Sequence, residues 1–131
     1  THYAALREGF GIKLIDRESI QMKLGQAAMD IEIGRVMVMR AAWRLENGSK
    51  ARQDISIAKI QVSQLLNRVV SDAIQICGAF GYSKDSILEW MYRYGRQALL
   101  VDGATEVHQM VISRFLRQPD AEFWSWGIGI D

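Results

Sequence analysis

The stretch with the most chemical potential is Leu99–Arg117, where a carboxylate, Asp102, stands directly before Gly103. Glycine lets the backbone turn tightly and lets a ligand approach the acid closely. From Thr105 onward, apolar residues recur at helical spacing. We therefore expect Asp102 at or just before a helix N-terminus, either as a capping residue or as a catalytic carboxylate. Composition alone does not choose between these two roles.

Two other groups of residues could bind a ligand. Arg7 and Phe10 place a cation and an aromatic ring on a glycine-flanked turn, an arrangement that suits a phosphate and a flat ring. Glu106 lies one helical turn after Asp102. Each group also has a structural interpretation: a surface arginine beside a core phenylalanine, and a solvated acidic start of a helix.

Several other kinds of site have little support. His2 and His108 are far apart, and no Glu-x-x-His pair is present, so we expect no metal centre. The single cysteine, Cys77, excludes an internal disulfide and a thiolate zinc site, and its usage suits the cytoplasm. It lies on an apolar helix face, so we expect it in the core. The glycines of Gly78–Gly81 follow a helix rather than a strand, so neither nucleotide-binding fingerprint applies.

Length and charge limit the remaining classes. At 131 residues the chain is expected to form one domain. Its formal net charge of +1 gives no electrostatic support for binding nucleic acid or a membrane surface. No apolar run approaches the roughly 20 residues of a membrane span.

The longest periodic pattern predicts a helix over residues 17–46, with Asp16 as N-cap and Gly48 as the stop. Its apolar seam advances by alternating steps of four and three residues, as in helical bundles. A second apolar stripe widens this surface, so the helix needs neighbours on more than one side. The members of the second stripe are Met22, Met29, Ile33, Val36, Met37 and Trp43.

The rest of the chain completes an all-α architecture. A helix ends near Leu6, and a second long helix over residues 54–78 should lie antiparallel to the first across a short polar connection. A loop over 78–85 and a short helix over 86–94 follow, and no strand is expected. We predict an antiparallel four-helix-type bundle over residues 1–118. The aromatic tail, 119–131, is expected to dock on another surface.

Four stretches, taken in order, resemble the C-terminal helical domain of the acyl-CoA dehydrogenases, flavoproteins that oxidise the Cα–Cβ bond of an acyl thioester. They are YAALREGFG at 3–11, IQMKLGQAAMDIEIGRVMVMRAAW at 20–43, AIQICGAFGYSKD at 73–85 and VDGATEVHQMVISRFL at 101–116. Four such matches in register are specific. The resemblance implies the same helical fold, and it does not cover the tail.

The resemblance implies FAD as cofactor and assigns residues to it. The family's Arg-x-x-Phe-Gly turn, here Arg7 and Phe10, contacts the diphosphate and adenine of a neighbouring subunit's flavin. The family's Gln-x-x-Gly-Gly segment, here Gln75, Gly78 and Ala79, lies along the ADP half of the same flavin. Alanine therefore replaces the second glycine of that segment.

The resemblance also implies a catalytic base. The family's Glu-Gly-Thr removes the α-proton while a hydride leaves Cβ; the matching residues here are Asp102, Gly103 and Ala104. Aspartate is one methylene shorter, but the chain is similar to a divergent branch that reads Asp-Gly-x-x-Glu-Val-His. Glu106 matches a position near the flavin in many members.

Partners follow from the same resemblance. It implies an acyl-CoA substrate, an electron-transfer partner and a homo-oligomer, a dimer or a tetramer. The family's N-terminal helical domain and middle β-domain are not represented here, so the domain alone is expected to be inactive. The competing hypothesis is a non-catalytic helical assembly module whose altered glutamate and threonine positions reflect decay.

Overall fold

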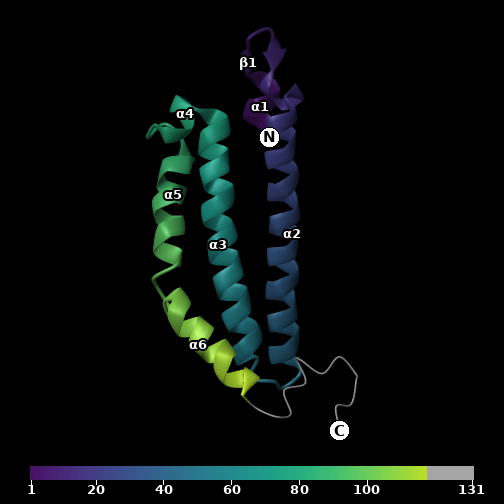
Figure 1. Ribbon diagram of the computed structural model, residues 1–131, viewed down its shortest axis with the longest axis vertical. Helices are drawn as coiled ribbons and strands as arrows, with labels where there is room; N and C mark the ends of the chain where they lie inside the picture. The colour runs from purple at the N-terminus through teal and green to yellow at the C-terminus, as the bar shows by residue number, and fades with distance from the viewer. Residues whose placement is uncertain (118–131) are drawn as a thin grey trace.

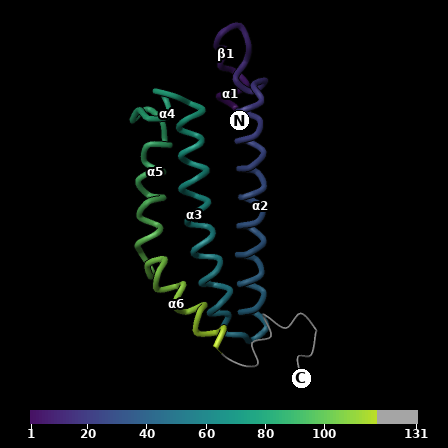
Figure 2. The backbone as a smooth tube through the Cα atoms, in the orientation of Figure 1, coloured from purple at the N-terminus to yellow at the C-terminus, as the bar shows by residue number. Residues whose placement is uncertain are grey.

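The computed structural model describes residues 1–117 as an elongated helical bundle (Figure 1). The predicted all-α fold is confirmed. Two long helices, α2 (Glu18–Glu46) and α3 (Arg52–Cys77), form its axis. Two shorter helices, α5 (Ile87–Ala98) and α6 (Thr105–Leu116), follow one another along the far side of α3 (Figure 2). The small elements α1 (His2–Leu6), β1 (Glu8–Gly9), β2 (Ile12–Lys13), a 3₁₀ turn (Leu14–Asp16) and α4 (Ala79–Tyr82) gather at one end.

Ion pairs link the antiparallel helices α2 and α3 along their length. Asp54 of α3 is 6% exposed, and its carboxylate lies 3.0 Å from Arg40 Nε and 3.3 Å from Arg44 Nη1 of α2. In the middle of the pair, Asp30 of α2 lies 2.7 Å from Arg68 Nη2 of α3. These contacts bury two carboxylates against cations from the opposite helix, so only one register of the two helices satisfies both.

The prediction that no strand is present is wrong. Within residues 1–117, β1 and β2 pair antiparallel, Glu8 with Lys13 and Gly9 with Ile12. The two turn residues, Phe10 (φ 54°) and Gly11 (φ 79°), both have positive φ. Two such residues in succession give a turn whose twist matches that of a two-residue hairpin. The hairpin projects beyond the end of α2 (Figure 1).

Two predicted helix starts differ from the structure. Asp16 is not the N-cap of α2, because it ends a 3₁₀ turn and Arg17 takes the cap position without a side-chain cap bond. The helix α3 begins at Arg52, two residues earlier than predicted, after Ala51 in the left-handed conformation. Neither cap follows the usual preference for a short polar side chain, so the sequence signal for both boundaries was misleading.

Two further segments contain more helix than predicted. The expected loop over 78–85 includes the single-turn helix α4. The helix α5 continues past Tyr94 to Ala98, because Gly95 is buried against Leu66 and Asn67 of α3 and does not end the helix. At its start, the Ser86 hydroxyl accepts a hydrogen bond from the Leu88 N–H, so this predicted boundary holds.

The second apolar stripe of α2 lies on its outer surface. Large apolar side chains that are more than half exposed include Met22, Met29, Ile33, Val36 and Trp43. Among the described residues, no helix is both long and apolar enough to cross a membrane. The aromatic tail predicted to dock elsewhere, 119–131, lies outside the described residues.

Candidate functional site

A cleft of about 530 Å³ lies where the hairpin approaches the end of α3. Its lining includes Arg7 and Phe10, from the predicted glycine-flanked turn, and Gly78 and Ala79, from the segment that matches the family's Gln-x-x-Gly-Gly. The Tyr3 ring stacks on Phe80 with centroids 5.6 Å apart, which joins α1 to α4 beside the cleft. Two motifs separated by about seventy residues of sequence therefore face one cavity.

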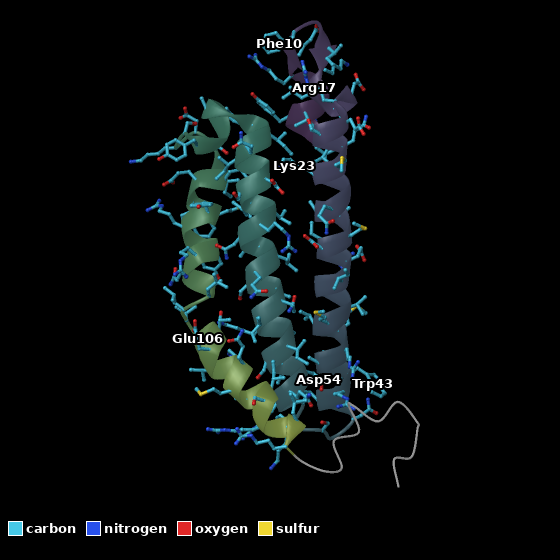
Figure 3. All side chains as sticks on the ribbon, viewed as in Figure 1. Phe10, Arg17, Lys23, Trp43, Asp54 and Glu106 are labelled. Carbon is cyan, nitrogen blue, oxygen red and sulfur yellow. The ribbon has the colours of Figure 1, made fainter. Side chains whose placement is uncertain are left out.

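Arg17 holds the turn that carries Phe10. Its Nη2 donates a hydrogen bond of 2.6 Å to the Gly9 carbonyl, and its guanidinium lies 5.8 Å from the centroid of the Phe10 ring. Phe10 itself is fully exposed at the tip of the hairpin, so its ring is available to a flat partner (Figure 3). Arg17 also lines the cleft, which gives the cavity a second guanidinium beside Arg7.

Gln75 and Cys77 are placed differently from the predictions made for them. Gln75 is exposed on the last turns of α3 and is not among the residues that line the cavity. Cys77, predicted as a core residue, is only half-buried and forms part of the cleft wall. Partial burial raises the pKa of the Cys77 thiol, so the thiol stays protonated at neutral pH.

Asp102 lies on the loop between α5 and α6, two residues before the N-cap of α6, which is Ala104. The capping interpretation of Asp102 is therefore wrong. Its φ of 54° is in the left-handed region, and Gly103 follows with φ 94°. Such a conformation costs a non-glycine residue of the order of 1 kcal/mol or more, so neighbouring contacts must maintain it. The Asp102 side chain is exposed.

Two side chains bind the backbone of this loop. His108 Nε2 lies 3.1 Å from the Asp102 carbonyl oxygen, and Lys59 Nζ donates a hydrogen bond of 2.6 Å to the Gly103 carbonyl. A carbonyl can only accept, so His108 Nε2 carries the hydrogen. His108 Nδ1 lies 3.1 Å from the hydroxyl of Ser56, which is 3% exposed.

These contacts belong to a longer polar row on α3. Ser56, Lys59, Ser63 and Asn67 recur at helical spacing, and each bonds to α6, α5 or the loop between them. Ser63 Oγ donates to the Ala98 carbonyl at 3.2 Å, and Asn67 Nδ2 donates to the Gly95 carbonyl. The row satisfies carbonyls near the C-terminal end of α5 that have no partner within the helix.

An apolar groove of about 450 Å³ runs between α2 and α3 and borders this row. Ala41 and Leu45 of α2 face Ala58 and Val62 of α3 across it. Lys59 and Ser63 line its edge and also bind the α5–α6 segment, so the groove lies next to the Asp102 loop.

The predicted site residues form two separate groups in this chain. Phe10 lies at the end that carries the hairpin, whereas Glu106, which is exposed, lies at the start of α6 far along the bundle (Figure 3). Arg17, Lys59 and His108 support the two groups and were not predicted from the sequence. For Lys59, the available signal was the recurrence of Ser56, Lys59, Ser63 and Asn67 at helical spacing along α3.

Comparison with known proteins identifies the family. The family model described as "Acyl-CoA dehydrogenase, C-terminal domain" matches residues 1–117. The chain is 34% identical over 114 residues to the caffeyl-CoA reductase–Etf complex subunit CarC of Acetobacterium woodii, covering 87% of this chain and 30% of that protein. It is 33% identical to (R)-benzylsuccinyl-CoA dehydrogenase of Thauera aromatica, covering 86% of this chain and 28% of the relative.

A solved structure agrees with this assignment. Butyryl-CoA dehydrogenase from Megasphaera elsdenii superposes with a TM-score of 0.87 at 32% identity, covering 89% of this chain and 30% of that chain. The present chain thus spans about a third of the length of these relatives. The family model, the sequence identity and the fold agree that this chain belongs to the acyl-CoA dehydrogenase family and corresponds to its C-terminal helical domain.

Proposed function

We propose that this chain is the C-terminal part of an FAD-dependent enzyme that dehydrogenates an acyl-CoA thioester between Cα and Cβ. The observation that carries the proposal is the cleft that gathers Arg7, Phe10, Gly78 and Ala79 from two distant stretches. Family membership supports an oxidoreductase. The names of relatives include both a dehydrogenase and a reductase of CoA thioesters, so the assay should run in both directions.

The lining of the cleft supports binding of the ADP half of FAD. Its two guanidinium groups, Arg7 and Arg17, suit a diphosphate, and the exposed Phe10 ring suits adenine. At Gly78, no heavy atom lies within 4 Å of where a Cβ would stand, so backbone is open to a ligand there. Gln75 would take part only if the flavin extends beyond the cleft. When bound, FAD supplies the acceptor for the hydride that leaves Cβ.

Asp102 is the proposed base. Its carboxylate would take the α-proton of the thioester, and the electron pair of that C–H bond would form the new Cα–Cβ double bond. The apolar groove between α2 and α3 offers a wall for an acyl chain next to the Asp102 loop. Glu106, one turn along α6, is proposed to lie near the flavin of the assembled enzyme.

The two groups of residues lie far apart on one chain, so we propose that each completes a site with other parts of the enzyme. The cleft would then bind the ADP half of a flavin whose reacting ring belongs to a neighbouring subunit. The alternative, a helical assembly module without catalysis, draws on the replacement of a glycine by Ala79 and of a threonine by Ala104.

The test of the base is Asp102→Asn in the complete enzyme that contains this chain. We expect acyl-CoA dehydrogenation to fall by about 10²- to 10⁴-fold, the usual contribution of a general base, with FAD content unchanged. Asp85→Asn makes the same chemical change at another exposed acid and should retain activity. Wild-type turnover in Asp102→Asn would contradict the assignment of the base.

The test of the cleft is Arg7→Gln, followed by the ratio of flavin to protein absorbance after purification. Removing one guanidinium from the cleft should lower FAD occupancy. Arg35→Gln, on the exposed side of α2, is the matched control and should leave occupancy unchanged. A complete enzyme that binds no FAD and turns over no acyl-CoA would favour the assembly module instead.

A further inference from the structure

We infer that His108 and Lys59 are positioning residues that hold the Asp102 loop in its left-handed conformation and thereby aim the carboxylate. This inference rests on the proposed role of Asp102 as the base. Neither side chain contacts the Asp102 carboxylate in the hydrogen bonds described, since both bind backbone carbonyls of the loop. They therefore act through the loop rather than on the substrate.

The two contacts bind successive peptide units. His108 binds the carbonyl of Asp102, and Lys59 binds the carbonyl of Gly103. The orientation of a carbonyl depends on the φ and ψ angles on either side of it, so two fixed carbonyls restrain the backbone that carries the carboxylate. The Thr105 N–H also donates to the Leu99 carbonyl at 3.2 Å, which closes the loop at its base.

His108 is itself held in place. While its Nε2 donates to the Asp102 carbonyl, its Nδ1 lies 3.1 Å from the buried Ser56 hydroxyl, so both ring nitrogens are within hydrogen-bonding distance of a partner. Ser56 lies on α3, the long helix that contacts both α5 and α6. Its contact with His108 therefore fixes the orientation of the imidazole ring relative to the axis of the bundle. Misplacing a reacting group by about 1 Å can lower the rate on the order of 100-fold, so residues that fix the position of the carboxylate contribute to the rate.

The space beside Gly103 agrees with this arrangement. A Cβ at this position would lie 2.8 Å from His108 Nε2 and 3.3 Å from His108 Cδ2. The imidazole therefore packs directly on the glycine while it binds the carbonyl before it. The loop therefore meets the imidazole ring both through a hydrogen bond and through close packing.

The experiment compares His108→Ala, His108→Gln, Lys59→Met and Asn67→Ala in the complete enzyme. Asn67→Ala is the matched control because it removes another bond from the α3 row, the one to the Gly95 carbonyl, away from Asp102. The readouts are kcat, KM, FAD content, and the rate at which an acyl-CoA exchanges its α-hydrogen for deuterium from D₂O. The exchange reports proton removal by the base.

We expect His108→Ala to lower kcat and α-hydrogen exchange together by about 10- to 100-fold, with KM and FAD content near wild type. His108→Gln retains an N–H donor and should recover part of both rates. Lys59→Met keeps the aliphatic stem but removes the ammonium, so it should lower both rates too. Asn67→Ala should reduce the melting temperature without changing exchange.

Two results would overturn the inference while leaving the base in place. One is wild-type exchange in His108→Ala when Asp102→Asn is inactive. The other is an equal loss of exchange in His108→Ala and Asn67→Ala, which would mark a general effect on folding. Full activity of Asp102→Asn would instead remove the proposed base, and the inference would fall with it.

Discussion

Phe10 and Asp102 share a backbone feature, since both are non-glycine residues with φ of 54°. Among residues 1–117, Ala51 is the only other non-glycine residue with a positive φ. Left-handed non-glycine residues concentrate where surrounding structure enforces a functional geometry. Each of the two has its own support: Arg17 binds the carbonyl before Phe10, and His108 binds the carbonyl of Asp102.

Gly103→Ala tests the strain at the Asp102 loop. Alanine disfavours φ of 94°, and its Cβ would meet His108 Nε2 at 2.8 Å. We expect the free energy of unfolding to fall by about 1–3 kcal/mol, as for other enforced backbone outliers. Chemical denaturation measures this loss. Gly25→Ala, at an open position on α2, should not destabilise the protein.

Asp30 predicts a dependence of stability on acid. The Arg68 guanidinium beside it holds the pKa of the Asp30 carboxyl below its ordinary value of 3.8, against the opposing effect of burial. The folded pKa is thus depressed, so the stabilisation is complete well above pH 3.8 and is lost as pH falls through the folded pKa. Thermal melts between neutral and acid pH measure this loss.

Asp30→Asn is the control for this titration. It removes the ionisable group, so the protein should be less stable at neutral pH and should lose less stability on acidification than wild type. Equal acid-induced losses in wild type and variant would show that other carboxyl groups account for the pH dependence.

At the scale of elements, α2 and α3 approach closely at Gly34. A Cβ there would lie 2.7 Å from Leu65 Cδ2 and 3.5 Å from Val62 Cγ2. The buried Asp54, between Arg40 and Arg44, sets the register at one end of the same pair of helices. The groove beside the Asp102 loop therefore depends on this packing.

Gly34→Val should separate or distort the two helices. Overpacking a close contact costs about 1–3 kcal/mol, and we expect a loss of that size in the free energy of unfolding. Gly25→Val places the same side chain at an open position of the same helix and should be near neutral. If both variants unfold at the same denaturant concentration, the helices are not in close contact at Gly34.

At the scale of the whole molecule, the outer face of α2 exposes Met22, Met29, Ile33, Val36 and Trp43. An apolar stripe along such a length of helix marks an interaction surface. We therefore propose that another copy of the chain covers it in the assembled enzyme, in line with the expected dimer or tetramer.

Ile33→Lys combined with Val36→Lys should weaken the proposed contact between copies, because burying two ammonium groups is costly. We expect light scattering to show a lower mass for the assembled enzyme that contains both changes. Gln61→Lys, on an exposed position of α3, is the control for added charge and should leave the mass unchanged. An unaltered mass in the double variant would place the interface elsewhere.

The local pattern of the sequence was enough to predict the two long helices and several candidate residues. Apolar residues spaced in alternating steps of four and three predicted α2 and α3 and their antiparallel order. Four stretches in register indicated the family, together with Arg7, Phe10 and Asp102 as candidate residues. Periodicity works there because these helices form by burying one face. The caps at Arg17, Ala51 and Ala104 escaped prediction, since none uses a side-chain cap bond.

Only the tertiary structure decided how the candidates are placed. It brought Arg7 and Phe10 to one cleft with Gly78 and Ala79, left Gln75 outside the lining of that cleft, and put Asp102 on a loop whose backbone binds His108 and Lys59. Contacts between residues far apart in sequence depend on how helices pack, and the spacing of residues along one helix carries no information about which carbonyl its polar side chains will meet.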